Sequence, residues 1–153
     1  MSVIGDGPNP GLAQFAISVK EIPKTTRFYI DVLGCLPAGG LLIWGERLAK
    51  IQGIEDPTAA LWWGVDKQDY VQMEFWQYSQ PLARPRPHEW KPCDIGYTRM
   101  GFVVDNFDAT ISALSNWGIG TLTPPMGPSG NRRAAFQDPD GILIELIEQD
   151  PLL

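Results

Sequence analysis

An alternation of apolar and polar residues, followed by apolar residues at helical spacing, marks the first ordered part of the sequence. The alternation runs through residues 14–19, the helical spacing through residues 28–33, and Gly34 follows directly. Alternation with a period of two is typical of a strand with one face on a core, and spacing of three and four residues is typical of an amphipathic helix. Pro23 suits the first helical turn, and glycine commonly follows the last. Residues 12–34 are therefore predicted to form a strand and a helix.

The same pattern returns in the second half of the chain. Residues 98–104 alternate again, and Phe107, Ile111 and Leu114 are spaced as one face of a helix that ends near Gly118. Self-similarity on this scale indicates two copies of one β-α-β-β-β unit. Each copy is too small to bury a core alone, so the two halves are expected to pair.

The other strands are predicted from runs of aromatic and β-branched residues between turn residues. These runs are residues 59–65 and 71–78 in the first half, and 132–137 and 142–147 in the second. The last two form a predicted hairpin across Asp138–Gly141, a run with strong turn chemistry. Residues 41–44 could form a strand, and residues 46–51 could form a strand or a helical turn.

Composition shifts divide the single expected domain into four segments. They are a flexible N-terminal arm (1–10), a first module (11–80), a proline-rich linker (81–95) and a second module (96–150). Proline lacks the backbone N–H that helices and sheets need, so the linker is expected to be extended.

Two stretches carry a family resemblance. FAISVKEIPKTTRFYIDVLG resembles the first module of the vicinal oxygen chelate superfamily, and FQDPDGILIEL resembles its last hairpin. That superfamily includes glyoxalase I, methylmalonyl-CoA epimerase, extradiol dioxygenases and bleomycin-resistance proteins. The likeness covers residues 12–148. It implies an α+β fold in which two paired βαβββ modules curl into a half-open barrel around a cavity.

The resemblance also implies four inward-facing strand positions, which hold a divalent metal in relatives. They are Gln14, Glu74, Arg99 and Glu145. Arg99 stands where the second module usually has histidine, and a protonated guanidinium cannot coordinate a cation. We therefore expect no metal cofactor, and we expect Arg99 to take the metal's electrostatic place between the two glutamates. The alternative is a divalent ion held weakly by Gln14, Glu74 and Glu145.

Strand alternation points to the same positions independently of the family resemblance, since each charged residue lies on a predicted strand dominated by apolar residues. Charges in a barrel mouth need partners, and two carboxylates around one arginine would satisfy that need. Two other interpretations stay open. Glu74 and Glu145 could lie on a solvated sheet face, and the pairing with Arg99 could be purely structural.

Aromatic residues suggest what the cavity binds. Trp62, Trp76 and Tyr78, together with Gln14, are predicted to bind the substrate, and Trp63 lies on the same pair of strands. An aromatic wall beside a carboxylate suits a flat, apolar ligand with an ionisable or enolisable group. The same residues could instead pack a module or dimer interface.

Composition limits the partners. The chain has 12 Lys+Arg against 18 Asp+Glu, a net charge of -6, which argues against nucleic acid as a partner. Cys35 and Cys93 are too few for a disulfide framework, and no signal peptide or bilayer-spanning run is recognised, so we expect a cytoplasmic protein without a membrane partner. His88 is the only histidine, which excludes sites built from several histidines, and a surface position in the linker is expected for it.

Three functions follow. The first is a glyoxalase-like lyase or isomerase, in which Glu74 or Glu145 abstracts a proton next to the carbonyl of a small apolar or aromatic substrate and Arg99 stabilises the enolate. The second is a small-molecule binding protein without catalysis, of the bleomycin-resistance type. The third is a weakly metal-dependent enzyme of the superfamily. In each case we expect a small-molecule ligand and a homodimer.

Overall fold

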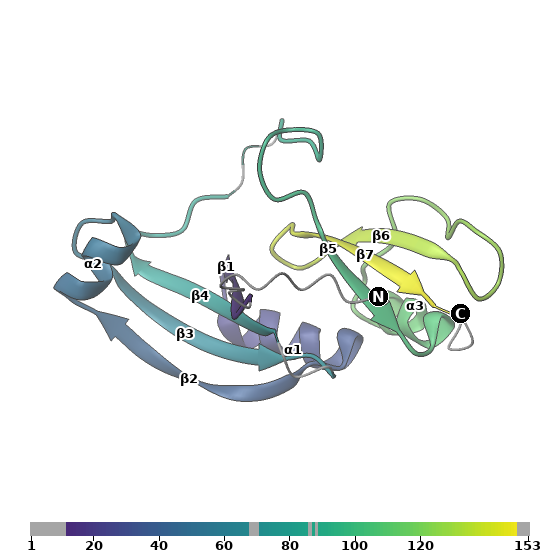
Figure 1. Cartoon of the computed structure of the whole chain (residues 1–153), viewed down its shortest axis with the longest axis horizontal. Helices are drawn as coiled ribbons and strands as arrows, with labels where there is room; N and C mark the ends of the chain where they lie inside the picture. Colours follow the sequence, from purple (N-terminus) through teal and green to yellow (C-terminus); the bar gives the residue numbers. More distant parts are fainter. Residues whose placement is uncertain (1–11, 68–70, 86, 88, 150–153) are drawn as a thin grey trace, which may run out of the picture.

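A computed structural model of the chain describes residues 12–67, 71–85, 87 and 89–149. Within these residues the fold is α+β, with two sheets and three helices (Figure 1). The first half contains β1 (Gln14–Ser18), α1 (Ile22–Leu33), β2 (Leu36–Trp44), α2 (Glu46–Gln52), β3 (Thr58–Val65) and β4 (Gln72–Gln80). The second half contains β5 (Met100–Val104), α3 (Phe107–Asn116), β6 (Arg133–Gln137) and β7 (Leu143–Glu148).

The two sheets repeat one topology. The first has the order β1-β4-β3-β2 with β1 parallel to β4, and the second has the order β5-β7-β6 with β5 parallel to β7. Strands β1 and β5 are therefore the corresponding edge strands of the two sheets. Figure 1 shows the sheets side by side, with β1 and β5 toward the middle of the molecule.

Local sequence signals set the element ends. Helix α1 has proline in its first turn and ends at Gly34, whose φ of 69° lies in the left-handed region that favours glycine. The segment that could have been strand or helical turn is the helix α2.

The second half has one strand fewer than the predicted βαβββ pattern. Between α3 and β6 the described chain makes only an isolated bridge, in which Met126 and Arg133 exchange backbone hydrogen bonds of 2.9 and 2.7 Å. Pro124, Pro125 and Pro128 surround Met126 and have no N–H to donate, so a longer ladder cannot form there.

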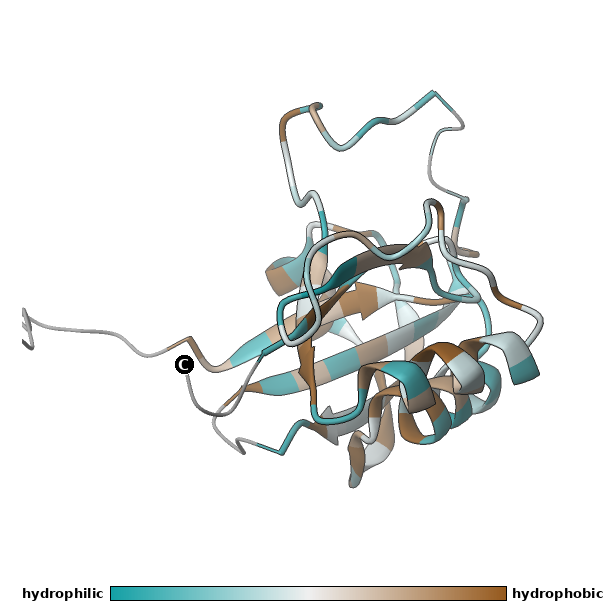
Figure 2. Cartoon of the chain, turned by 90° about the vertical axis from the view of Figure 1, so that its right-hand side faces the viewer, coloured by the Kyte–Doolittle hydropathy of each residue, from teal (hydrophilic) through white to brown (hydrophobic). Residues whose placement is uncertain are grey.

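One hydrophobic core joins the two halves. It contains Phe28, Tyr29 and Phe75 from the first half, and Phe107 and Phe136 from the second. Helices α1 and α3 touch each other and lie on one side of the strands (Figure 2). Because the buried side chains come from both halves, neither half completes its core alone.

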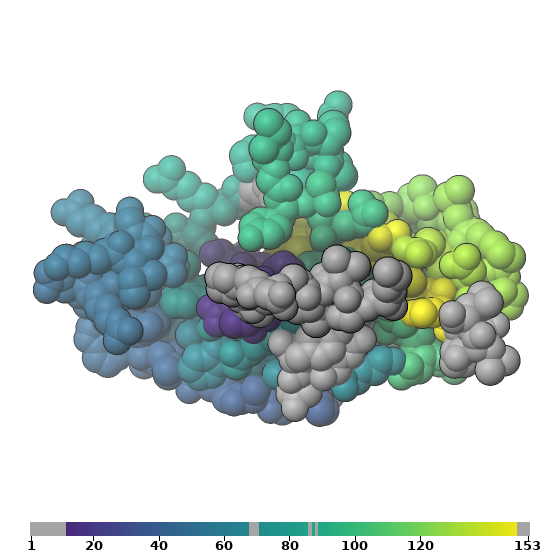
Figure 3. Space-filling view, in the orientation of Figure 1, coloured from purple at the N-terminus to yellow at the C-terminus, as the bar shows by residue number. Residues whose placement is uncertain are grey.

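The connection between β4 and β5 contains no helix or strand in its described residues, 81–85, 87 and 89–99. Figures 1 and 3 show the part around residues 89–97 standing above the two sheets. The predictions for His88, a surface position, and for residues 1–10, a flexible arm, fall outside the described part of the chain.

Candidate functional site

Glu74 is the third residue of β4, on the face of the sheet turned away from α1. Its neighbours Met73 and Phe75 belong to the core that contains α1, and successive strand residues point to opposite faces. In the sheet register Glu74 is the partner of Trp63 on β3 and of Ala16 on β1. Donors from both neighbouring strands can therefore reach its carboxylate.

Three N–H groups hold this carboxylate. Gln14 Nε2 and Trp76 Nε1 donate to Oε2, each at 3.0 Å, and Trp63 Nε1 donates to Oε1 at 2.7 Å. Glu74 is only 5% exposed, and among the described residues its hydrogen-bond partners are all uncharged. Both oxygens therefore accept hydrogen bonds, and within the described residues these come from neutral donors.

A second charged cluster lies on the three-stranded sheet. Arg99 Nε donates to Glu145 Oε2 at 2.9 Å, and Arg133 Nη1 lies 3.6 Å from Glu145 Oε1. Both arginine side chains are about half exposed, whereas that of Glu145 is 20% exposed. Glu145 thus lies between two guanidinium groups, and the cluster carries one positive charge in excess.

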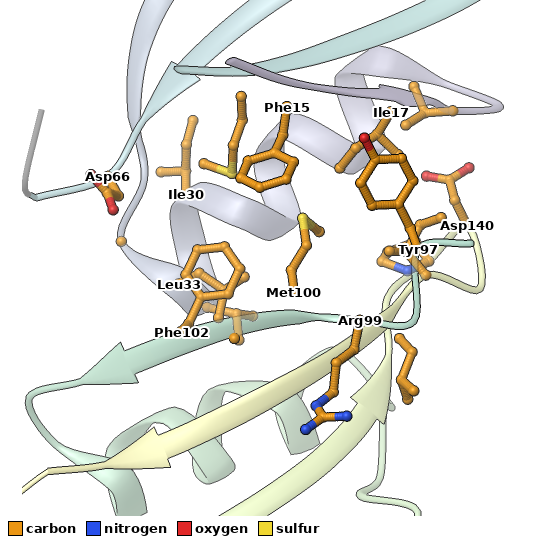
Figure 4. A pocket seen from close by; sticks show the side chains of 18 of the residues that line it. Phe15, Ile17, Ile30, Leu33, Asp66, Tyr97, Arg99, Met100, Phe102 and Asp140 are labelled. Carbon is orange, nitrogen blue, oxygen red and sulfur yellow. The ribbon is translucent and has the colours of Figure 1, made fainter. Parts of the chain in front are cut away.

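A cavity of about 1600 Å³ lies between the edge strands β1 and β5 (Figure 4). Apolar side chains of both halves line it, chiefly Phe15, Ile17, Leu33, Met100 and Phe102. Tyr97 also lines the cavity, with its ring centroid 6.5 Å from that of Phe15 in an edge-to-face arrangement. Polar and charged residues also line the cavity, among them Gln14 and Arg99 and the aspartates Asp31, Asp66, Asp105 and Asp140. The cavity therefore meets each of the two clusters at one residue, Gln14 of the first and Arg99 of the second.

The four predicted positions fall into two pairs. Gln14 is bonded to Glu74 and Arg99 to Glu145, and within the described residues no hydrogen bond or ion pair connects the pairs. The expected arrangement was two carboxylates around one arginine, whereas the structure has one carboxylate between two arginines. The physical reason is that β1 and β5 do not pair, so the cavity keeps Glu74 apart from Arg99.

The aromatic residues divide between the two faces of the first sheet. Trp76 and Tyr78 share the face of Glu74 and stack with centroids 5.9 Å apart. Trp62 points to the opposite face, where its ring lies 6.1 Å from that of Phe75, and Trp63 is the tryptophan that bonds Glu74. Neither Trp62 nor Trp76 nor Tyr78 is among the described residues that line the cavity.

The aromatic lining of the cavity was missed by sequence reasoning. Phe15 and Phe102 alternate as core-facing residues of their strands, and Tyr97 precedes β5 in a stretch without regular structure. The internal repeat could have indicated this lining, because Phe15 and Met100 occupy corresponding positions in the two copies, each on an edge strand.

A divalent metal, which the resemblance implies for these four positions, does not fit the residues present. The N–H hydrogens of three donors point at the Glu74 carboxylate, and the oxygens of Glu145 face two guanidinium groups. A cation at either carboxylate would meet donor hydrogens or a fixed positive charge. Within the described residues no group of three or more His, Cys, Asp or Glu could hold a metal ion.

The chain belongs to the Glyoxalase/Bleomycin resistance protein/Dioxygenase superfamily, whose family model matches residues 11–146. Solved structures of low sequence identity share its fold. A glyoxalase family protein from Bacillus cereus has a TM-score of 0.83 at 18% identity, over 94% of this chain and 97% of that one. TnmS3, an antibiotic binding protein from a Streptomyces species, has a TM-score of 0.55 at 17% identity, over 91% of this chain and 95% of that one.

Two further proteins are similar to this chain. The fosfomycin resistance protein FosX from Listeria monocytogenes, solved with Mn(II) and a dihydroxypropylphosphonic acid, has a TM-score of 0.60 at 15% identity, over 92% of this chain and 94% of that one. The uncharacterized protein YaeR from Escherichia coli is 33% identical over 73 residues, which are 47% of this chain and 55% of YaeR. The chain thus spans about half the length of this curated relative. No helix in the described part of the chain is long and apolar enough to cross a membrane.

Proposed function

We propose that the protein binds a small, largely apolar organic molecule in the cavity between β1 and β5. The carrying observation is the lining, of which apolar and aromatic side chains such as Phe15, Met100 and Phe102 make the larger part, with polar groups such as Gln14 and Arg99 beside them. Concave sites of this composition are the usual binding sites for small organic ligands, and its volume of about 1600 Å³ is ample for one.

Of the four predicted site residues only Gln14 and Arg99 line the cavity, which favours binding over proton abstraction by Glu74 or Glu145. The carboxylates that do line the cavity belong to Asp31, Asp66, Asp105 and Asp140. Neither the amide of Gln14 nor the guanidinium of Arg99 can accept a proton near neutral pH. The two glutamates lie one hydrogen bond further away, behind these two side chains, and both are occupied by protein donors. A general base must lie within hydrogen-bond reach of the substrate, and neither glutamate is among the described residues that line the cavity.

The contact with Glu74 gives Gln14 a defined role. Because Gln14 Nε2 donates one hydrogen to Glu74, the amide orientation is fixed, and its carbonyl oxygen and second N–H hydrogen are left for a ligand. The buried carboxylate is therefore a positioning group for the amide that lines the cavity.

A lyase or isomerase activity is the second candidate, because Glu74 is a buried carboxylate without a charged partner among the described residues. Rotation of Gln14 would free one acceptor position of Oε2, which also accepts from Trp76, for a substrate proton. The replacement Glu74→Gln separates the two functions. It leaves binding within a few-fold of wild type if Glu74 only positions Gln14, and it abolishes turnover if Glu74 is the base.

We further propose a homodimer in the cytoplasm. Strand β2 forms the outer edge of its sheet and exposes Leu36, Leu42 and Trp44 by 59%, 67% and 67%, an apolar edge that a second copy could cover. Both cysteines are free, as is usual in a reducing compartment.

Blocking the cavity tests the binding function. Ala109 is an exposed residue of α3 that lines the cavity, and Ser112 is an exposed residue of the same helix that does not. Binding of aromatic probes is measured by calorimetry and by quenching of tryptophan fluorescence. Ala109→Phe is expected to weaken binding by about tenfold, roughly 1.4 kcal/mol, because the added ring takes up part of the cavity, whereas Ser112→Phe leaves binding unchanged. Equal affinities in both variants would refute the cavity as the binding site.

A further inference from the structure

The connection between β4 and β5 contributes residues to the binding cavity. Residues 83–85 and 87, which follow β4, and residues 97 and 98, which precede β5, line the cavity together with the two edge strands. The sequence predicts only an extended, proline-rich linker for residues 81–95. The connection therefore joins the two halves and also supplies lining residues from both of its ends.

Tyr97 reaches from this connection across the gap between the two halves. Its ring meets that of Phe15 on β1 edge-to-face, with centroids 6.5 Å apart and an angle of 76° between the ring planes. Figure 4 shows the ring between the two edge strands, with its hydroxyl on the side of Ile17. Tyr97 is nevertheless 81% exposed, so the contact with Phe15 covers only a small part of its surface.

The side chain of Tyr97 therefore has unused capacity for contacts. Within the described residues its hydroxyl makes no hydrogen bond, and Phe15 is the only ring that its own ring contacts. Tyr29 differs in both respects, since it is fully buried and its hydroxyl donates to Asp138. A tyrosine offers an apolar ring together with a hydroxyl that both donates and accepts. A ligand in the cavity would cover this ring and give the hydroxyl a partner.

The lining around Tyr97 indicates the kind of ligand. The rings of Phe15, Tyr97 and Phe102 come from three separate segments, and Figure 4 shows the thioether of Met100 among them. Aromatic rings attract one another edge-to-face or offset-stacked, and a thioether sulfur contacts ring edges favourably. An aromatic ligand gains these contacts in addition to apolar burial, whereas a saturated ligand of the same size gains the burial alone.

We propose that Tyr97 is a specificity-determining residue of the cavity. Its ring selects aromatic over saturated ligands, and its hydroxyl forms a hydrogen bond with a polar substituent of the ligand. The assignment rests on the proposed binding function, because Tyr97 acts on the molecule held between β1 and β5.

Three matched probes measure the selection. Affinities for naphthalene, 2-naphthol and decahydro-2-naphthol, the saturated analogue of 2-naphthol, are obtained by calorimetry. Wild type is expected to prefer 2-naphthol over its saturated analogue. In Tyr97→Ala this preference should shrink by about three- to tenfold, the factor for one aromatic pair.

Tyr97→Phe separates the hydroxyl from the ring. It should bind naphthalene as wild type does and keep the preference for the aromatic alcohol over the saturated one. It should bind 2-naphthol about three- to tenfold more weakly, the factor for one hydrogen bond.

Ile95→Ala is the control, because Ile95 belongs to the same connection, is fully exposed and does not line the cavity. It should leave the affinities for all three probes unchanged. Since both Ile95 and Tyr97 are exposed, all three variants should melt at the wild-type temperature, which shows that a changed affinity is not caused by unfolding.

The two proposals fail differently. Wild-type affinities of Tyr97→Ala for all three probes would overturn the role of Tyr97 and leave cavity binding intact. The role would also be overturned if Ile95→Ala weakened binding as much as Tyr97→Ala does, or if Tyr97→Phe weakened naphthalene as much as 2-naphthol. No binding of any probe to wild type would overturn both proposals.

Discussion

Replacing Tyr29 with phenylalanine should weaken the coupling between the two halves of the molecule. Tyr29 lies on α1 and is fully buried, and its hydroxyl donates to Asp138 Oδ2 at 3.0 Å, in the turn between β6 and β7. Burial raises the pKa of the Tyr29 hydroxyl far above its ordinary value, so the hydroxyl stays protonated and donates. The other carboxylate oxygen of Asp138 accepts backbone N–H groups of Asp140 and Ile142, which cannot substitute for the lost donor.

The expected loss follows from this geometry. Asp138 is 5% exposed, so the variant leaves a buried carboxylate oxygen without its donor. A hydrogen bond to a charged group contributes about 1.5–3 kcal/mol. At about 2–4 °C per kcal/mol for a domain of this size, the melting temperature of Tyr29→Phe should fall by about 3–12 °C at neutral pH. Scanning calorimetry and chemical denaturation measure the loss.

The loss should also depend on pH. Burial raises the pKa of Asp138, so its contribution to stability is complete below the unfolded pKa and declines as pH rises through the folded pKa. Removing the donor raises the folded pKa further, because the ionised form loses a partner. The difference between wild type and Tyr29→Phe should therefore be larger at neutral pH than at pH about 4.

Tyr97→Phe is the matched control, since Tyr97 is 81% exposed and its change should stay within about 0.5 kcal/mol. A Tyr29→Phe protein that melts within about one degree of wild type at neutral pH would refute the reasoning, because it would show that the buried carboxylate does not need the hydroxyl.

Two further predictions concern other charged groups. Hydrogen bonds from Arg132 lower the pKa of Glu148 from 4.5 to about 2, so stability gained from its ionised form is present above the ordinary pKa and is lost as pH falls toward 2. Glu148→Gln should accordingly be less stable than wild type at neutral pH, with the gap narrowing as pH falls, and a gap independent of pH in urea titrations would contradict this. Mn²⁺ or Zn²⁺ added to metal-free protein should leave the melting temperature unchanged, because the donors around Glu74 and Glu145 do not fit a cation. A melting temperature that rises with metal concentration would show that these residues rearrange into a metal site.

Local patterns were sufficient to predict most of the secondary structure. Alternation and helical spacing predicted β1, α1, β5 and α3, and the glycine after α1 ends that helix as expected. These features depend on neighbours a few residues apart, which a sequence displays directly. The absence of a strand directly before β6 could also have been predicted, since three prolines interrupt that segment.

Alternation also placed Glu74, Trp76 and Tyr78 on one face of β4, because side chains of a strand point alternately to its two sides. It could not decide which tryptophan of β3 meets Glu74. That choice depends on the register between β3 and β4, in which Trp63 and not Trp62 is opposite Glu74. Register is a relation between strands, and either tryptophan is compatible with the sequence of β3 alone.

The sequence by itself thus determined the secondary-structure elements, the repeated unit, and which charged residues lie among apolar neighbours on a strand. Only the tertiary structure decided how the two halves meet. The distance between two edge strands that do not pair follows from the packing of α1 against α3 in the shared core, to which residues far apart in the chain contribute together. That packing opens a cavity between β1 and β5, separates Glu74 from Arg99, and gives Glu145 a second arginine, Arg133, which no sequence pattern had singled out.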